Sequence, residues 1–394
     1  MTEAAALLAP AAIRERCSNI TAAVGDGRSP HFRIDRSRLA AAAAEVAGVT
    51  RRRYPDLVVP YHSRWRHFEA GGVDRRAELE DGLADRSRAD RARAEIDLTI
   101  VSVLLDAGAG APWSFIERES GQRYSRSEGL GVASFRAFMD GAFSDDPREP
   151  LRVDAAALQR IDAATLASMF QVTDANPLIG VDGRAALLRR LGDALGPNVR
   201  PSVVFDTLAG AGRTTVDATD LLVTLLRQFN SIWLTGQTQG GVALGDVWPH
   251  RWAGGSGPTA GRVPFHKLTQ WLAYSLFEPI ERAGVTIARH DALTALPEYR
   301  NGGLLIDTGV LALADPRSAA VAHDVGSELV VEWRALTVSL LDELAPRVRS
   351  LLGVPALSLA SMLEGGTWAA GRGLARQLRG GEPPLKIAAD GTVF

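Results

Sequence analysis

The amino-acid sequence predicts a mainly α-helical globular fold with a few short strands. Two features of the composition support this: Ala and Leu dominate the 46% of residues that are hydrophobic, and aromatic residues make up only 6% of the chain. Both features favour helices over sheets. The third observation is that apolar residues recur every three or four positions over several long stretches, as they do along one face of a helix.

The predicted helices follow one another along most of the chain. They are expected over residues 3–24, 36–50, 74–107 (two helices), 131–143, 151–196 (a helix pair), 217–234, 268–279, 323–353 (interrupted at Pro346) and 356–378. Asp35 or Ser37 can cap the second helix and Asp162 one of the pair, because short polar side chains accept hydrogen bonds from free N–H groups of the first turn. Asp97 is expected at the start of an apolar helix, where a carboxylate is favourable.

Short strands are expected in the Gly- and Trp-containing residues 236–265 and again in residues 299–313. A chain of 394 residues is long enough for two lobes. We expect an N-terminal helical lobe with ligand-binding loops over residues 1–150. A C-terminal helical lobe over residues 151–394 should contain the densest polar and aromatic stretch, 262–311, and the lobes are expected to pack as one unit.

Composition and missing motifs exclude several classes of protein. The formal net charge of -2 gives no sign of a nucleic-acid or membrane surface. The single cysteine, Cys17, excludes an intramolecular disulfide and a cysteine-rich zinc site, and it fits the reducing cytoplasm. The N-terminus lacks the basic region of a secretory signal, and no apolar run is long enough to span a membrane. The phosphate-loop, HExxH and GxSxG motifs are absent, and we expect neither a cofactor nor a metal.

A four-residue period marks the stretch 262–311. His266, Gln270, Tyr274 and Glu278 recur every four residues, so they should form one stripe along a helix. An imidazole, an amide, a phenol and a carboxylate beside an apolar face are typical of a functional surface. They are equally typical of a buried, hydrogen-bonded seam between helices.

Two further segments contain candidate ligand-binding residues. Residues 61–68 concentrate two His, two Arg and three aromatic residues, and arginine forks with aromatic rings can hold an anionic, planar or sugar-like ligand. The alternative is a loop that fixes the N-terminal helices by salt bridges. Arg126 and Glu128 precede a predicted helix N-terminus, where backbone N–H groups can bind a phosphate.

Several motifs resemble a known family. The segments HKLTQWLAYSLFEPIERAG, YRNGGLLIDTGVL, PYHSRWRHF, RSEGL and the terminal DGTVF are similar to those of the uracil-catabolism protein family of fungi and bacteria. The resemblance covers essentially the whole chain. It implies a role in a pyrimidine-degrading pathway beside a GTP-cyclohydrolase-II-like enzyme, a possible functional partner, and a uracil phosphoribosyltransferase.

A fainter similarity connects the chain to the queuosine-salvage nucleotide N-glycosidases. The segments PLIGVDGRAALLRRLG, LTQWLAYSLFEPIERAG and GSELVVEWRALTV resemble segments of those proteins in the same order. This resemblance implies a helical, DNA-glycosylase-like fold and cleavage of an N-glycosidic bond. Where those glycosidases have an Asp shortly before a Tyr, this chain has Ala273 before Tyr274, and the nearest carboxylate is that of Glu278.

These resemblances lead us to expect an N-glycosidase that releases urea from a ribosylurea 5-phosphate. Glu278 or Asp307 is the expected carboxylate, and Tyr274 and His266 are the expected proton donor and orienting group. The expected substrate-binding residues are His62, Arg64, Arg66, His67, Arg126, Glu128, Lys267, Gln270, Trp271, Tyr299, Arg300 and Asn301. Two alternatives stay open: a non-catalytic partner of the ring-opening enzyme, and another hydrolase that acts on a ring-opened pyrimidine.

Overall fold

The chain forms two compact units, each assembled from segments that are far apart in the sequence. The computed structural model describes residues 3–388 except 107, 111 and 234–236, so the terminal DGTVF segment lies outside the described residues. Of these, the first unit contains residues 3–62, 237–270 and 289–388, and the second contains 63–233 and 271–288. Residue 150, the expected boundary between lobes, lies inside the second unit.

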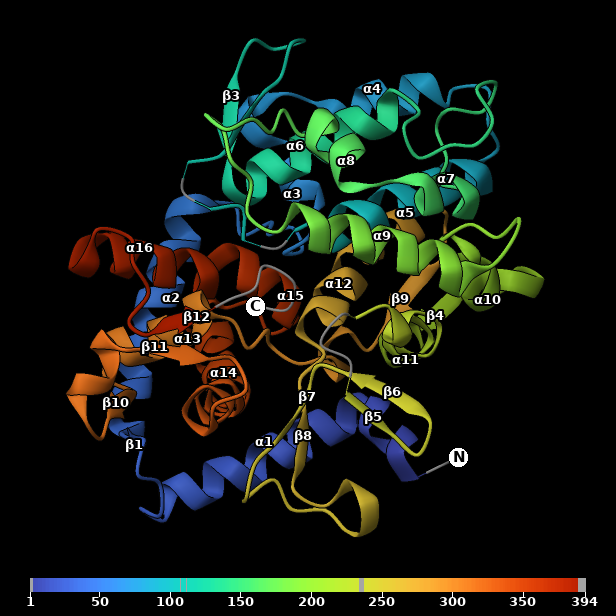
Figure 1. The fold of residues 1–394 in the computed structure, drawn as a ribbon. Coiled ribbons are helices and arrows are strands. Elements are labelled where there is room, and N and C mark those ends of the chain that lie inside the picture. Colours follow the sequence, from blue (N-terminus) through green and yellow to red (C-terminus); the bar gives the residue numbers. More distant parts are fainter. Residues whose placement is uncertain (1–2, 107, 111, 234–236, 389–394) are drawn as a thin grey trace. The chain divides into compact units, whose positions relative to one another are not determined.

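The first unit is built around one long helix, α14 (Glu328–Leu352), which packs against α1 (Pro10–Gly25) and α2 (Leu39–Arg53) (Figure 1). The α14 side chains Val331, Ala335 and Val338 share a fully buried apolar core with residues of α1. The helix continues through Pro346, where the sequence predicts an interruption. The remaining helical elements are η1 (Glu3–Leu8), η2 (Arg36–Arg38), η6 (Gly257–Thr259), η7 (His290–Ala292), α13 (Tyr299–Asp307), η8 (Pro316–Ala320), α15 (Leu359–Met362), the π-helical turn η9 (Leu363–Thr367) and α16 (Trp368–Arg379).

Two-stranded ribbons complete the first unit. The pairs are β1 (Phe32–Ile34) with β10 (Leu311–Leu313), β5 (Gln237–Gln239) with β6 (Val242–Gly245), β7 (Val247–Pro249) with β8 (Arg262–Pro264), all antiparallel, and the parallel pair β11 (Ala322–Asp324) with β12 (Lys386–Ala388). The strands predicted between residues 236 and 265 are therefore confirmed. Of residues 299–313, Leu311–Leu313 form a strand, whereas Tyr299–Asp307 form helix α13.

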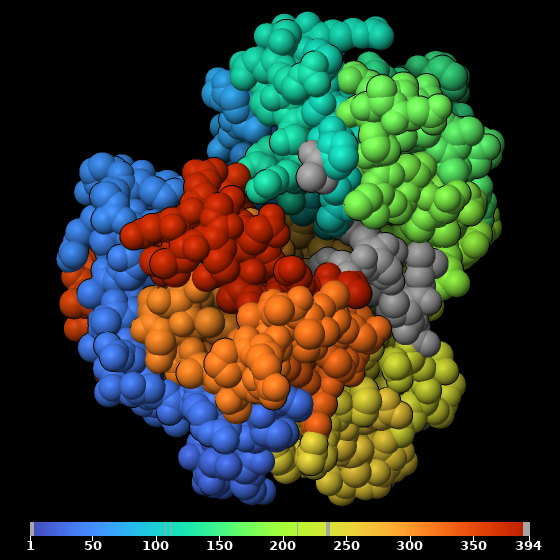
Figure 2. Space-filling model, turned by 60° about the vertical axis from the view of Figure 1, so that its left-hand side comes forward, coloured from blue at the N-terminus to red at the C-terminus, as the bar shows by residue number. Residues whose placement is uncertain are grey.

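The C-terminal helices of the first unit pack closely on its N-terminal ones. Helix α16 contacts both α13 and α2. In the space-filling view, the red atoms of this C-terminal region lie against the blue N-terminal segment and over the orange one (Figure 2). This packing brings together the end of α2, the start of α13 and the turn between α15 and α16.

The second unit surrounds helix α5 (Arg88–Leu104), which is almost entirely buried from Ala94 onward. Its other elements are α3 (Trp65–Phe68), η3 (Ala70–Gly72), α4 (Arg75–Gly82), β2 (Ser114–Ile116), β3 (Arg123–Ser125), α6 (Arg126–Met139), α7 (Ala155–Arg160), α8 (Ala163–Met169), α9 (Val181–Leu195), α10 (Val203–Ala209), η4 (Gly210–Gly212), β4 (Thr215–Asp217), α11 (Ala218–Phe229), η5 (Asn230–Ile232) and β9 (Thr286–Ala288). Strands β2 and β3 pair antiparallel, and β4 and β9 pair parallel. Helix α12 (Lys267–Arg282) contributes its first turn to the first unit and the rest to the second.

Asp162 and Asp97 are both expected at helix starts, and the structure confirms this only for Asp162. Asp162 caps α8 as expected, because its side chain accepts a hydrogen bond of 2.7 Å from the Thr165 N–H. The expectation for Asp97 is wrong, since α5 begins at Arg88 behind the Ser87 cap. Asp97 is fully buried inside the helix and accepts hydrogen bonds from Arg200 and from the backbone of Ser202. Among the described residues, no helix combines the length and the apolar character needed to cross a membrane.

Candidate functional site

A π-helical turn between α15 and α16 positions Glu364 in the first unit. Such turns interrupt regular helices and are frequent at functional sites. Gly366 makes this turn fit against α2: a Cβ atom at this position would lie 2.5 Å from Cγ1 of Val46 and 2.8 Å from Oγ1 of Thr50. The close approach places Glu364 beside the C-terminal end of α2.

Glu364 is held by three side chains from the N-terminal segment. Arg53 donates a hydrogen bond of 2.8 Å to Oε1, and the Tyr54 hydroxyl lies 3.3 Å from the same oxygen. The Nδ1 atom of His62 lies 2.8 Å from Oε2. Burial disfavours the charged form, but the hydrogen bonds and positive charges of His62 and Arg53 outweigh it and lower the pKa of Glu364 to about 2.

A second carboxyl group, that of Glu298, caps the N-terminus of α13. It accepts hydrogen bonds from the backbone N–H groups of Arg300, at 2.8 Å, and Asn301, at 2.5 Å. Burial raises the pKa of Glu298, although these two hydrogen bonds and the charges of Lys267 and His62 act in the opposite direction. Glu298 is thus displaced toward its protonated form and Glu364 toward its ionised form.

His62 contacts Glu364 and an aromatic ring, and its charge also acts on Glu298. Its imidazole centroid lies 5.7 Å from that of the Trp368 ring, over which the Arg372 guanidinium lies at 5.1 Å. We call Arg53, His62, Glu298, Glu364 and Trp368 the carboxylate cluster. Two carboxyl groups with opposed pKa shifts are a feature of many acid–base active sites.

Several residues singled out from the sequence lie at this cluster. His62 is a member, Lys267 acts on Glu298 through its charge, and the backbone N–H groups of Arg300 and Asn301 bind Glu298. Tyr299 is partly exposed beside them, with the Arg300 guanidinium 4.7 Å from its ring centroid. Sequence reasoning missed the two glutamates, Arg53 and Trp368. The available signal was the pair Gly365-Gly366 inside an otherwise helical pattern, which marks an irregular turn.

The first three residues of the predicted stripe lie in the interior, although His266 precedes helix α12 and has a positive φ of 49°. Nε2 of His266 lies 2.9 Å from the Leu7 carbonyl oxygen, and burial lowers the pKa of His266. Gln270 donates to the Phe265 carbonyl oxygen and accepts from the backbone N–H of Thr294. Tyr274 is fully buried, and its ring packs edge-on against Phe277. These contacts match the buried seam, one of the two readings that the sequence left open.

The two carboxylates expected to be catalytic are both engaged in ion pairs. Asp307, at the C-terminal end of α13, receives two hydrogen bonds from Arg379, at 2.8 and 2.7 Å, and its side chain is only 2% exposed. Glu278 in the second unit accepts hydrogen bonds of 2.7 Å from Arg66 and 2.7 Å from Ser63. Neither contact tests a catalytic role, which stays a prediction for both residues.

The remaining candidates belong to the second unit, where Arg64 is the centre of a buried polar group. Arg64 is fully buried and lies 3.1 Å from the Asp106 carboxylate and 2.9 Å from Nδ1 of His67. The Trp271 ring centroid is 5.8 Å from the Arg64 guanidinium. Burial opposes ionisation of Asp106, but the charges of Arg64 and His67 lower its pKa.

The loop preceding α6 supplies the last two candidates. Glu128 acts on Arg64 through its charge. Arg126 is exposed at the first position of α6 with a positive φ of 56°, a conformation uncommon for non-glycine residues. The predicted ligand loop therefore divides, with His62 in the first unit and Arg64, Arg66 and His67 in the second. Within the described part of the chain, no three His, Cys, Asp or Glu side chains lie close enough to hold a metal ion.

The fold and the carboxylate cluster define a mainly helical protein in whose first unit two carboxyl groups have opposed pKa shifts. The chain belongs to the DUF1688 family, described as "Protein of unknown function", whose model matches residues 6–394. It is 40% identical over 380 residues to "Protein urg3" of Schizosaccharomyces pombe, with 92% of both chains covered. It is 38% identical over 410 residues to "Uracil catabolism protein 4" of Lachancea kluyveri, covering 94% of this chain and 93% of that relative. The family resemblance inferred from the motifs is confirmed.

Proposed function

We propose that this protein hydrolyses the N-glycosidic bond of a ribosylurea 5-phosphate in uracil degradation and releases urea and ribose 5-phosphate. The pathway assignment is supported by the name of the Lachancea kluyveri relative, which aligns with 94% of this chain. The observation that carries the reaction is the pair of carboxyl groups with opposed pKa shifts, Glu298 and Glu364, on both of which the charge of His62 acts.

Glu364 has the properties of the group that stabilises the transition state. Breaking the bond between C1′ and nitrogen gives C1′ oxocarbenium character, which a nearby carboxylate stabilises. With a pKa of about 2, Glu364 is ionised at neutral pH. Because it is 6% exposed, its charge acts in surroundings where water screens it poorly. In the proposal it also orients the attacking water.

Glu298 has the properties of the proton donor. Urea leaves as a neutral molecule only if its nitrogen gains a proton as the C–N bond breaks. Burial raises the pKa of Glu298 and so increases the protonated fraction near neutral pH. Water adds its oxygen to C1′, and the proton that it loses restores Glu298, so the sum is one water consumed for one urea and one ribose 5-phosphate formed.

The other members of the cluster position these groups. His62 and Arg53 hold both oxygens of Glu364, which fixes the direction of the carboxylate. The Trp368 ring beside His62 offers a flat surface for a planar urea or a sugar face. Lys267, whose charge already acts on Glu298, provides a cation for the substrate phosphate.

A direct assay tests this proposal. Synthetic ribosylurea 5-phosphate is incubated with the purified protein, and urea and ribose 5-phosphate are measured together. The proposal requires equal amounts of the two products. Absence of urea with the wild-type protein, or urea without ribose 5-phosphate, would reject the reaction.

A further inference from the structure

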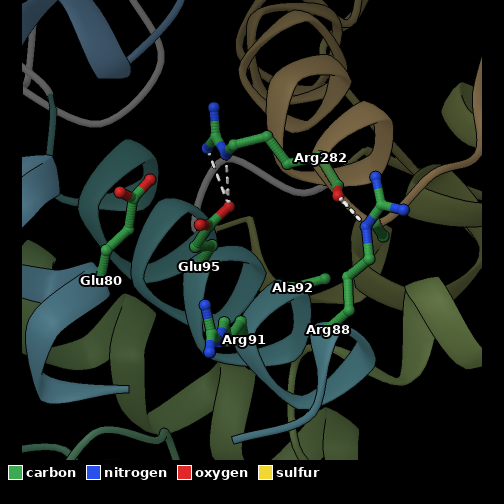
Figure 3. Close-up of a pocket in the computed structure, with 7 residues that line it drawn as sticks. Glu80, Arg88, Arg91, Ala92, Glu95 and Arg282 are labelled. Carbon is green, nitrogen blue, oxygen red and sulfur yellow. Dashed lines mark hydrogen bonds and ion pairs between the residues drawn. The ribbon is translucent and has the colours of Figure 1, made fainter. Parts of the chain in front are cut away.

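The second unit contains an open pocket that the proposed reaction does not use. It lies between α4, α5 and the C-terminal end of α12 and has a volume of about 510 Å³ (Figure 3). Its lining residues are Glu80, Arg88, Arg91, Ala92, Glu95, Arg282 and Ala283. Five of them are charged, and three of these are arginines.

One wall of the pocket is formed by the ion pair of Glu95 and Arg282, whose opposite charges compensate each other. Nε and Nη2 of Arg282 each lie 2.8 Å from Oε2 of Glu95. Figure 3 shows the two side chains facing each other across the space between α5 and α12. The Arg282 guanidinium also lies 4.3 Å from the Trp65 ring centroid, which fixes its position further. Because the carboxylate of Glu95 is compensated, it adds little negative charge to the pocket.

One edge of the Arg88 guanidinium is held by a hydrogen bond, and its other edge is available to bind a ligand. Its Nε donates a hydrogen bond of 2.6 Å to the backbone oxygen of Arg282. Among the described residues, its two terminal amino groups have no acceptor. Gly284 provides the space for this guanidinium: a Cβ atom there would lie 2.9 Å from Nη1 of Arg88, and its φ of +90° favours glycine.

Arg91 is held in the same manner. Its Nε donates to the Arg86 carbonyl oxygen at 3.1 Å, and its Nη2 donates to the Ala84 carbonyl oxygen at 2.5 Å. Its Nη1 has no acceptor in the part of the chain that the structure describes. Glu80, the other acidic residue of the lining, is paired with Arg76 at 3.3 Å. The charges left uncompensated in the pocket are therefore those of Arg88 and Arg91.

We propose that this pocket binds the phosphoryl group of a small phosphate monoester, with Arg88 and Arg91 as its two hydrogen-bonding cations. Guanidinium groups donate two parallel hydrogen bonds to phosphate oxygens, and a phosphate dianion has enough oxygens for two such groups. Ala92, a small and buried residue, completes the lining on α5. A hollow of about 510 Å³ also accommodates a sugar attached to the phosphate.

Calorimetric titration of the full-length protein tests the proposal. The probes are inorganic phosphate, ribose 5-phosphate and ribose. Both phosphates are expected to bind and ribose is not, because the phosphoryl group supplies the contacts. Tighter binding of ribose 5-phosphate than of inorganic phosphate would show that the pocket also contacts the sugar. Equal affinity for the two would show that the pocket binds the phosphoryl group alone. Failure of both phosphates to bind would overturn the proposal.

Three variants separate this pocket from general charge effects. Arg88→Gln should weaken phosphate binding about tenfold or more, as expected for the loss of a charge-assisted pair of hydrogen bonds. Glu80→Gln should strengthen it, because a negative charge is removed from the lining. Arg86→Gln is the matched control, since Arg86 is exposed and paired with Glu149 outside the lining.

Equal weakening by Arg88→Gln and Arg86→Gln, or unchanged binding in Arg88→Gln, would contradict the proposal. Because the proposed reaction binds the substrate phosphate at Lys267, the Arg88→Gln difference is also measured in a Lys267→Gln background, where it should persist. The readout is binding and not urea release. The proposal of a phosphate-binding pocket and the proposed reaction are therefore tested independently of each other.

Discussion

His62 and Glu364 form a contact of 2.8 Å across 302 positions of the sequence. The imidazole holds one oxygen of a buried carboxylate, while its charge acts on the second carboxyl group, that of Glu298. The contact helps to keep Glu364 ionised at neutral pH, whereas burial raises the pKa of Glu298 against the opposing charge of His62.

The ionised state of Glu364 should stabilise the fold in a defined pH range. A carboxyl group whose folded-state pKa is lowered contributes stability above its unfolded-state pKa and loses it as the pH falls. Here the loss should occur as the pH falls from the ordinary glutamate pKa of 4.5 to the folded-state pKa of about 2. The difference between these pKa values corresponds to about 3 kcal/mol of unfolding free energy.

Denaturant unfolding of the wild type and Glu364→Gln at pH 7, 4 and 3 measures this contribution. The wild type should be more stable at pH 7, and its advantage should shrink as the pH falls. An advantage that is constant over this range would contradict the assignment.

Deprotonation of Glu298 should cause the fall in activity on the alkaline side of the pH profile. Because burial raises its pKa, the protonated fraction is present at low pH and is lost as the pH rises through that pKa. Urea release should fall accordingly, and the residual activity of Glu298→Gln should lack this limb. The measurement is the pH dependence of kcat/KM for both proteins.

A stability control separates this role from helix capping. The two backbone N–H groups at the start of α13 bind different oxygens of Glu298, and glutamine keeps one of these oxygens, so Glu298→Gln should lose less stability than Glu298→Ala. Glu298→Ala should lose about 1 kcal/mol, the usual cost of a missing cap. An unchanged rate in a stable Glu298→Gln protein would remove Glu298 from the mechanism.

Gly366→Ala should displace Glu364 without changing any charge. The added methyl group would lie 2.5 Å from the Val46 side chain, so the π-helical turn must move. We expect a loss of about 1–3 kcal/mol in unfolding free energy, as for other overpacked sites, together with a lower kcat. Chemical denaturation and the urea assay measure the two effects.

Gly373→Ala is the matched control for that substitution. Gly373 lies in α16, exposed to solvent, and a Cβ atom there would meet nothing within 4 Å. It should stabilise the protein by about 0.5–1 kcal/mol, because alanine favours helices, and leave the activity unchanged. Equal effects of the two substitutions would show that the turn does not need its close approach to α2.

Asp307→Asn tests whether the catalytic carboxylate is Asp307, one of the two predicted from the sequence, or Glu364, which we propose from the structure. The substitution weakens the paired hydrogen bonds to Arg379, so we expect it to lower the unfolding free energy by about 1–3 kcal/mol. Under our proposal, kcat of the folded variant should stay within a few-fold of the wild-type value. A loss comparable to that of Glu364→Gln, in a protein that melts normally, would restore Asp307 as the catalytic carboxylate.

Local patterns predicted the local structure well. The apolar spacing located most helices, and the short polar residue Asp162 marked the start of one. The errors have physical causes. Asp97 resembles a capping residue in the sequence, but helix α5 extends further because its charged N-terminal half is also helical. Pro346 does not end α14, because the packing of the helix on α1 and α2 outweighs the lost hydrogen bond.

The site was harder to predict because its members are distant in the sequence. The four-residue period correctly placed Gln270 and Tyr274 on one helix, whereas His266 precedes α12 with a positive φ of 49°. Periodicity also does not show which groups face these side chains. Glu364 becomes notable only through Arg53 and His62, more than 300 positions earlier. Such contacts follow from tertiary packing and leave no local signal.

The most direct test of the central claim is the single-turnover rate of urea release from ribosylurea 5-phosphate by the wild type and Glu364→Gln. If the ionised Glu364 stabilises the oxocarbenium-like transition state, the variant should be slower by about 100-fold or more, a loss typical of a preorganised electrostatic contact. Circular dichroism and the melting temperature confirm that the variant is folded. A folded Glu364→Gln protein that releases urea at the wild-type rate would contradict the account.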